Sequence, residues 1–118
     1  MTVPTDTTVY HICTRQAIND ARTIGSYRAE SLAREGFIHL SCAHQVAPTA
    51  RAYFSGVPDL VLLVIDPTQL SAPLRYEPPA SLPSSTPKPA SGELYPHCYG
   101  PIDLAAIVDV LDLANWSD

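Results

Sequence analysis

The apolar run at residues 59–66, DLVLLVID, constrains the fold more than any other part of the sequence. Successive side chains of an extended segment point to opposite faces, so this run would be apolar on both faces. A strand of that kind must be covered on both sides, which places it in the middle of a sheet. The length of 118 residues suits a single domain over residues 1–118 built around it.

Shorter segments with recognisable periodicity stand on either side of this run. Strands are predicted at residues 8–13, 37–41 and 73–77 and at the end of 103–113. Helices are predicted at residues 14–24, in the second half of 26–36 and over 43–55. The segment 93–102 is rich in turn-forming residues and is predicted to be irregular. Short helices mixed with short strands indicate the α+β class.

Residues 78–92 form a different kind of segment, with five prolines and several serines. Proline lacks a backbone N–H and fixes its φ angle, so this segment can neither pair as a strand nor continue as a helix. It is predicted to be a long, mobile surface loop, and shortening it should leave the fold intact.

Composition excludes several classes of protein. The net charge is -5, and the 7 Lys and Arg residues do not cluster, so no nucleic-acid partner is expected. No apolar run reaches the ~20 residues that a membrane helix needs. The N-terminal residues lack the pattern of a secretory signal, and the 3 cysteines have no paired spacing. Free thiols and a cytoplasmic location are the resulting expectations. Nothing indicates an oligomeric state.

Three of the 4 histidines are candidate site residues. His11 lies in the first predicted strand, His39 in the second, and His97 in the turn-rich segment near the end. Each has a polar residue two positions further on, so two functional groups share a face where the chain is extended. Neutral imidazole can orient hydroxyl groups, and its pKa suits acid–base chemistry near neutral pH. We therefore expect the three rings to converge, whereas His44 should cap a helix or face solvent.

Other interpretations of these residues stay open. Each histidine could be a buried structural residue bonded to backbone. No C-x2-C or H-x3-H spacing supports a metal site, so none is predicted. Cys13 and Cys42 lie near histidines, but small buried thiols are the simpler interpretation. Tyr27 and Tyr99 could stack on a flat ligand, and Glu77 is a candidate acid.

Several motifs in one order resemble a known family. They are "VYHI" at 9–12, "GSYRAES" at 25–31, "EGFIHLS" at 35–41, "QV" at 45–46, DLVLLVID, "YE" at 76–77 and "PHCYGPI" at 96–102. Together they resemble the bacterial domain-of-unknown-function family 952, from Val9 to about Val110. Two departures stand out: Ile18 stands where the family usually carries tryptophan, and the Pro/Ser segment is longer than usual.

The resemblance implies an ADP-ribosyltransferase-like fold, a split β-sandwich of two small sheets with short flanking helices. NAD would then lie in a histidine-lined cleft between the sheets. The resemblance gives His11 the role of binding the adenosine-side ribose, and it places His39 or Ser41 near the nicotinamide. The third position is usually a glutamate. Here it is open between His97, Glu77 and Glu93, and a missing glutamate would resemble the RNA 2′-phosphotransferase branch.

The leading hypothesis is an enzyme that binds NAD or an ADP-ribose-type ligand and transfers or cleaves the ribosyl group. The first alternative is a cofactor-independent histidine acid–base enzyme, an isomerase, cyclase or lyase, acting on a small metabolite. The second is a non-catalytic metabolite-binding module. The candidate catalytic residues are His39, His97 and His11. The candidate ligand-binding residues are Tyr27, Ser31, Ser41, Gln45, Glu77 and Tyr99.

Overall fold

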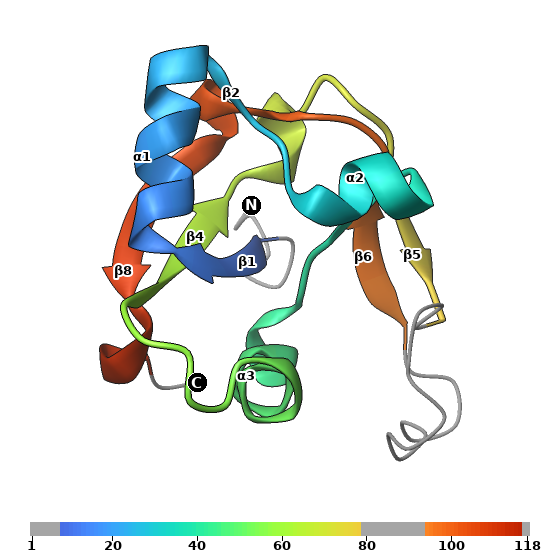
Figure 1. Ribbon diagram of the computed structural model, residues 1–118. Coiled ribbons are helices and arrows are strands. Elements are labelled where there is room, and N and C mark those ends of the chain that lie inside the picture. The colour runs from blue at the N-terminus through green and yellow to red at the C-terminus, as the bar shows by residue number, and fades with distance from the viewer. Residues whose placement is uncertain (1–7, 79–93, 117–118) are drawn as a thin grey trace, which may run out of the picture.

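The apolar run forms the central strand of a three-stranded antiparallel sheet, β1-β4-β8, in the computed structural model (Figure 1). The structure describes residues 8–78 and 94–116. The strands are β4, Leu60–Ile65; β1, Val9–Thr14; and β8, Ile107–Asp112. Alternate residues of β4 face two different apolar clusters, so both of its faces are covered. The predicted central position of this strand is therefore correct.

A second antiparallel sheet has the order β3-β6-β5. Its strands are β3, Ile38–His39; β6, Tyr95–Cys98; and β5, Leu74–Glu77. The prediction that residues 93–102 are irregular is wrong, since β6 is the middle strand of this sheet. The backbone N–H of Leu40 donates to the carbonyl oxygen of Pro96 at 2.9 Å. Pro96 has no N–H to return the bond, which accounts for the end of β3 at His39 and for the shortness of the predicted strand 37–41.

A pair of short strands, each of two residues, was not predicted from the sequence. It consists of β2, Ser26–Tyr27, paired antiparallel with β7, Ile102–Asp103. The loop expected after the first helix therefore contains a short strand. Two residues carry too little periodicity to be recognised before the partner strand is known.

The α-helices of the described residues flank the sheets (Figure 1), and their bounds are α1, Arg15–Ile24; α2, Glu30–Glu35; and α3, Val46–Tyr53. Thr14 caps α1 by accepting a hydrogen bond from the N–H of Ala17 at 3.1 Å. Gly25 and Gly36, with φ angles of 109° and 90°, end α1 and α2 in a conformation that favours glycine. A 3₁₀ turn, Ala43–Gln45, leads into α3, and Pro48 lies in the first turn of that helix as predicted.

One large cluster of apolar side chains joins the two three-stranded sheets. Leu63 of β4, Ile38 of β3, Cys98 of β6 and Ile18 of α1 all belong to it. A smaller cluster on the other face of the first sheet lies under α3 and includes Leu62. The chain is therefore a small compact α+β domain whose second sheet turns one face toward the common core.

The edge strand β8 is irregular along its length. Its register against β4 shifts between Val64 and Ile65, so Val108 has no partner across the ladder and is exposed. The side chain of Asp109 accepts a hydrogen bond from the N–H of Val110 at 2.8 Å.

Three further expectations concern the Pro/Ser segment, the state of the cysteines and membrane-spanning helices. The Pro/Ser segment 78–92 lies outside the described residues except for Pro78. No disulfide joins any of the three cysteines, Cys13, Cys42 and Cys98. In the described part of the chain, no helix has the length and apolar character needed to cross a lipid bilayer.

Gly100 provides a test of the close packing between β6 and the segment before β5. A methyl group added at Gly100 would lie 2.7 Å from the Cβ of Ala72. We therefore expect Gly100→Ala to lower the free energy of unfolding by ~1–3 kcal/mol in a denaturant melt.

The double variant Gly100→Ala with Ala72→Gly removes the obstructing methyl group and is the matched control. It should be more stable than Gly100→Ala alone. An unchanged melt for Gly100→Ala would contradict this description of the packing.

Candidate functional site

The outer face of the second sheet carries a cluster of aromatic and ionisable side chains. The register pairs His39 with His97 and His97 with Arg75, so these three residues form one row across β3, β6 and β5. Phe37 and Tyr99 lie in the neighbouring row, because they are two positions from His39 and His97. The intervening residues, such as Ile38, belong to the core on the opposite face. Alternation along two short strands therefore separates the site from the core.

Glu77 connects two members of this cluster. One of its carboxylate oxygens, Oε1, lies 2.9 Å from Nδ1 of His97 and 2.5 Å from the hydroxyl of Tyr99. A carboxylate only accepts hydrogen bonds, so both partners donate to it. The hydrogen bond from Tyr99, followed by that from His97, lowers the pKa of Glu77. The same contact with Glu77 raises the pKa of Tyr99, because a charged carboxylate favours the protonated phenol.

His97 is held by stacking as well as by Glu77. Its ring lies nearly parallel to that of Phe37, with ring centroids 4.2 Å apart, and only 1% of the residue is exposed. Since Nδ1 donates to Glu77, neutral His97 keeps a lone pair on Nε2. Among residues 8–78 and 94–116, nothing forms a hydrogen bond with this buried Nε2 atom. Buried polar atoms without partners are rare. A ligand group or a water molecule that donates a hydrogen bond to this Nε2 atom would satisfy it.

His39 is the accessible histidine of the cluster. Its Nε2 atom lies 3.1 Å from Oε1 of Glu35, and its side chain is 41% exposed. Its ring meets the edge of the Phe37 ring at 4.9 Å and lies 5.4 Å from the ring of His97. The cluster thus contains two glutamate–histidine pairs on either side of Phe37, one buried and one open to solvent.

His11 lies behind this face and is bonded at both ring nitrogens. Nδ1 is 2.7 Å from the carbonyl oxygen of His39, and Nε2 is 2.8 Å from the hydroxyl of Tyr27. The carbonyl can only accept, so Nδ1 carries the proton and Nε2 accepts from Tyr27. Burial lowers the pKa of His11 to about 4. Burial likewise raises the pKa of Tyr27 and raises that of Cys13 to about 11. A neutral, fully bonded His11 therefore supports the backbone of His39.

Three other predicted ligand-binding residues make contacts within the protein. The hydroxyl of Ser31 donates to the carbonyl oxygen of Phe37 at 2.9 Å. Ser41 is buried, and its backbone exchanges two hydrogen bonds with that of Tyr10. Gln45 is buried too, with its amide bonded to the N–H of Cys42 and the carbonyl of Leu94. These contacts hold the segments that carry Phe37 and His39.

The structure therefore brings together His39, His97, Glu77 and Tyr99 from the predicted set. His11 is connected to this group by its hydrogen bond to the backbone carbonyl of His39. Tyr27 is connected to it indirectly, by its hydrogen bond to His11. The exposed His44 lies on the 3₁₀ turn before α3, as expected. Glu93 lies outside the described residues.

Sequence reasoning missed three members of the cluster, Glu35, Phe37 and Arg75. Signals for them exist in the sequence. Phe37 is two positions from His39, and Arg75 is two positions from Glu77, which is the spacing of one strand face. Glu35 is four residues before His39, but the chain turns at Gly36 between them. Only the tertiary structure shows that their side chains meet.

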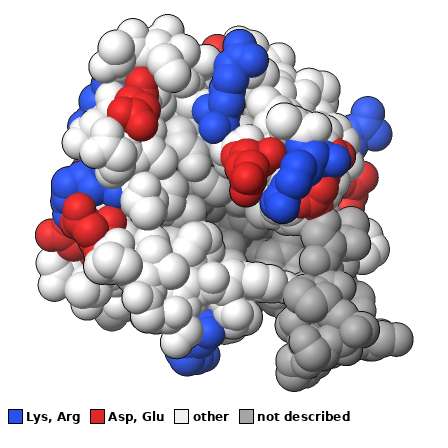
Figure 2. All heavy atoms as spheres, in the orientation of Figure 1, with Lys and Arg blue, Asp and Glu red and all other residues white. Residues whose placement is uncertain are grey.

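Charges on the face shown in Figure 2 gather over α2, where acidic and basic side chains lie side by side. Arg34 lies 4.0 Å from Glu30 and 3.7 Å from Glu35. Glu35 thus lies between the guanidinium of Arg34 and the ring of His39. In the described ranges, 8–78 and 94–116, no group of three or more His, Cys, Asp or Glu side chains could hold a metal ion.

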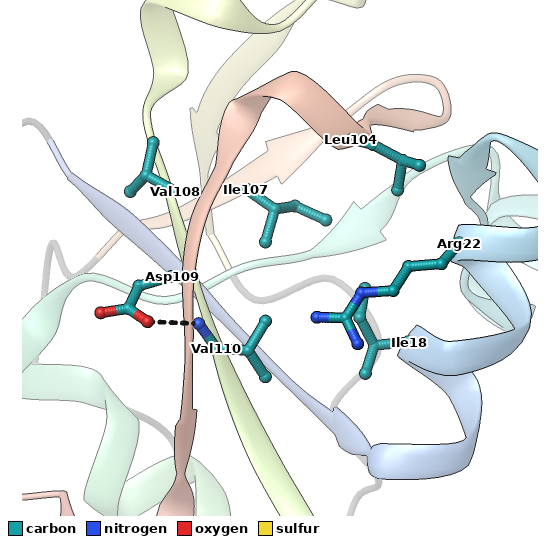
Figure 3. A pocket seen from close by; sticks show the side chains of 7 residues that line it. All are labelled: Ile18, Arg22, Leu104, Ile107, Val108, Asp109 and Val110. Carbon is teal, nitrogen blue, oxygen red and sulfur yellow. Dashed lines mark hydrogen bonds between the residues drawn. The ribbon is translucent and has the colours of Figure 1, made fainter.

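Two hollows lie outside the cluster, and only one of them borders it. One, of about 600 Å³, is lined by Tyr99, Ser71 and Asp103 among others. The other, of about 530 Å³, lies between α1 and β8, and Figure 3 shows Arg22 and Asp109 among its lining side chains. Neither is lined by a histidine. Of the predicted site residues, only Tyr99 borders one of them.

Comparison with known proteins gives a family and a fold. The profile of the family described as "Protein of unknown function (DUF952)" matches residues 12–110. A crystal structure of protein CC0527 from Caulobacter crescentus is 28% identical, with a TM-score of 0.74, and covers 90% of this chain and 85% of that chain. A double mutant of CC0527 gives 27% identity and a TM-score of 0.74, with the same coverage. The solution NMR structure of CC0527 gives 28% identity and a TM-score of 0.63, and covers 90% of this chain and 84% of that chain. No curated protein matches.

The buried His11 predicts a specific dependence of stability on pH. Its pKa is about 4 in the folded protein, below the ordinary value of 6.5, so the unfolded chain takes up a proton first as the pH falls. Stability from this residue is complete above pH 6.5 and is lost between pH 6.5 and pH 4, by about 3 kcal/mol. His11→Asn keeps a donor at the Nδ1 position and cannot be protonated. Denaturant melts of both proteins at several pH values should show the difference in slope, and parallel slopes would disprove it.

Alanine substitutions at His39 and at its neighbour Ile38 distinguish a site residue from a core residue. Ile38→Ala removes a fully buried side chain and should cost ~2–5 kcal/mol of unfolding free energy. His39→Ala removes a partly exposed side chain and should cost about 0.5 kcal/mol or less. Urea melts of the two variants measure this difference. An equal loss for both would mean that His39 is a structural residue.

Proposed function

Because this chain belongs to the DUF952 family of proteins of unknown function, we propose from the site itself that it is an ADP-ribosyltransferase-like enzyme. The resemblance implies a cleft between the sheets, but apolar side chains pack there. In this proposal, NAD or a related ADP-ribose compound therefore binds against the outer face of the second sheet, where His39 and His97 lie. The enzyme then transfers or cleaves the ribosyl group. The partly exposed carboxylate of Glu77, beside His97, supplies the glutamate that the resemblance implies near the reacting ribose.

The single observation that carries the proposal is the unpartnered Nε2 atom of buried His97. Glu77 fixes the ring through Nδ1 and leaves Nε2 as a preorganised acceptor. A carboxylate that orients a histidine in this way is the usual arrangement for a general base. A ribose hydroxyl or an attacking hydroxyl group would satisfy Nε2 by donating its proton.

Glu77 has the charge that ribosyl transfer requires. Breaking the bond between C1′ of the ribose and its leaving group develops positive charge on the ring, and a fixed carboxylate stabilises that charge. The side chain of Glu77 is 34% exposed, so a ligand can approach it. The lowered pKa of Glu77 keeps the carboxylate ionised at neutral pH.

His11 acts as a positioning residue in this proposal. Both of its ring nitrogens are occupied by His39 and Tyr27, so neither is available for the adenosine-side ribose that the resemblance assigns to it. Its hydrogen bond to the carbonyl oxygen of His39 instead holds β3 at a fixed distance from β1.

A cofactor-independent acid–base enzyme is the second candidate, and the burial of His97 favours it. Phe37 covers one face of the His97 ring, which limits the room beside Nε2. A small metabolite needs less room there than a dinucleotide. The pair of accessible His39 and buried His97 could then supply a base and an acid on one substrate. A non-catalytic binding module would use the same hydrogen-bonding groups without turnover.

Calorimetric titration with NAD, ADP-ribose and nicotinamide tests the proposal. We expect the native protein to bind at least one ribose-containing compound and His97→Asn to bind it at least about tenfold more weakly. Asparagine keeps a donor at the Nδ1 position for Glu77 but has no group at Nε2. The control is His44→Asn, which changes an exposed histidine outside the cluster and should bind as the native protein does.

Turnover separates the candidates. If the native protein releases nicotinamide from NAD and His97→Asn does not, the result would support the transferase. Failure of all three compounds to bind would overturn it in favour of the acid–base enzyme on a smaller metabolite. If His97→Asn and the native protein bind with equal strength, Nε2 of His97 does not contact the ligand.

A further inference from the structure

Arg75 stands at the open edge of the candidate site. It lies on β5, the edge strand of the second sheet, directly across from His97 and two positions before Glu77. Its guanidinium carbon is 5.5 Å from the centre of the Tyr99 ring. This cation–π contact places the guanidinium on the same face as His97 and Glu77.

Arg75 differs from the arginines whose charge is neutralised by carboxylates. Arg15 is held by Asp59 and Asp112, and Arg34 lies near Glu30 and Glu35. Among residues 8–78 and 94–116, no carboxylate lies within ion-pair distance of Arg75. Glu77 is near enough for Arg75 to lower its pKa, but its Oε1 atom is engaged by Tyr99 and His97. The guanidinium is therefore a positive charge on an exposed side chain whose N–H donors are available to a ligand.

We propose that Arg75 is the anion subsite of this face and binds a phosphate group of the ligand; this inference rests on the proposed function and specifies its substrate as a phosphorylated ribosyl compound. Arginine suits this role because its planar donors bind two phosphate oxygens at once. Stacking on Tyr99 orients the guanidinium before the ligand arrives, which reduces the entropy lost on binding.

The spacing of the strands fits such a ligand. Neighbouring strands lie ~4.8 Å apart, so a phosphate at Arg75 would stand about one strand away from a hydroxyl at His97. A ribose that carries a phosphate spans a distance of this order. In a chain with a net charge of -5, the positive charge of Arg75 also gives an anionic ligand a specific place to bind.

The test is an NMR titration of isotope-labelled protein with three probes: inorganic pyrophosphate, ADP-ribose and uncharged adenosine. Pyrophosphate should shift the amide signals of β5 and Tyr99. Arg75→Gln should weaken binding of ADP-ribose by about 10- to 100-fold, the value of a charge-assisted hydrogen bond, and leave adenosine binding unchanged. Arg75→Lys should recover part of the loss. Arg51→Gln, which alters an exposed arginine on α3, is the matched control and should change nothing.

Ionic strength gives a second readout that a purely structural role would not affect. Affinity for ADP-ribose should fall with added KCl in the native protein and much less in Arg75→Gln, because salt screens an exposed ion pair. Absence of shifts with pyrophosphate, or equal weakening of adenosine and ADP-ribose in Arg75→Gln, would overturn the subsite while leaving the proposed function in place. Binding of pyrophosphate at Arg75 without binding of ADP-ribose would retain the subsite and overturn the proposed function.

Discussion

One imidazole joins all three sheets of this protein. His11 belongs to β1 in the first sheet, donates to the carbonyl of His39 in the second, and accepts from Tyr27 in the two-stranded pair. Hydrogen bonds in a buried environment are strong, and leaving either partner unsatisfied would be costly. Because the ring is neutral, this connection needs no counter-ion. The position of His39, and with it the row that runs through His97 to Arg75, depends on this contact.

The sequence predicts best the elements whose side chains obey one simple period. Within the run at residues 59–66, positions 60–65 are all apolar, which favours a central strand covered on both faces. Residues 95–98 were misjudged because proline normally argues against a central strand. Here Pro96 lies opposite Tyr76 of β5 on one side and meets only Leu40 on the other, at the point where β3 ends, so the missing N–H disturbs that one pair with β3.

The candidate site was predictable in part for the same reason. His39, His97, Glu77 and Tyr99 were named because each lies next to a recognisable motif. The rings of His11, His39 and His97 were expected to converge; pairing of β3 with β6 brings His39 and His97 together, whereas His11 contacts only the backbone of His39. The contacts of Ser31 and Gln45 depend on where distant backbone carbonyls lie, which no local pattern reveals. Glu35 and His39 are brought together by the turn at Gly36. The difference between a ring with a vacant nitrogen, His97, and one with both nitrogens bonded, His11, is a property of the tertiary structure alone.

The irregular edge of the first sheet has a consequence for the behaviour of the protein at high concentration. A regular six-residue edge strand would be a template on which the strand of another molecule could add, and repeated addition leads to fibres. In β8, Val108 interrupts the register and the Asp109 side chain already occupies the N–H of Val110. A strand from a second molecule would meet a displaced residue and an acidic side chain in adjacent positions. In the part of the chain that the structure describes, these two features oppose the addition of a further strand along β8.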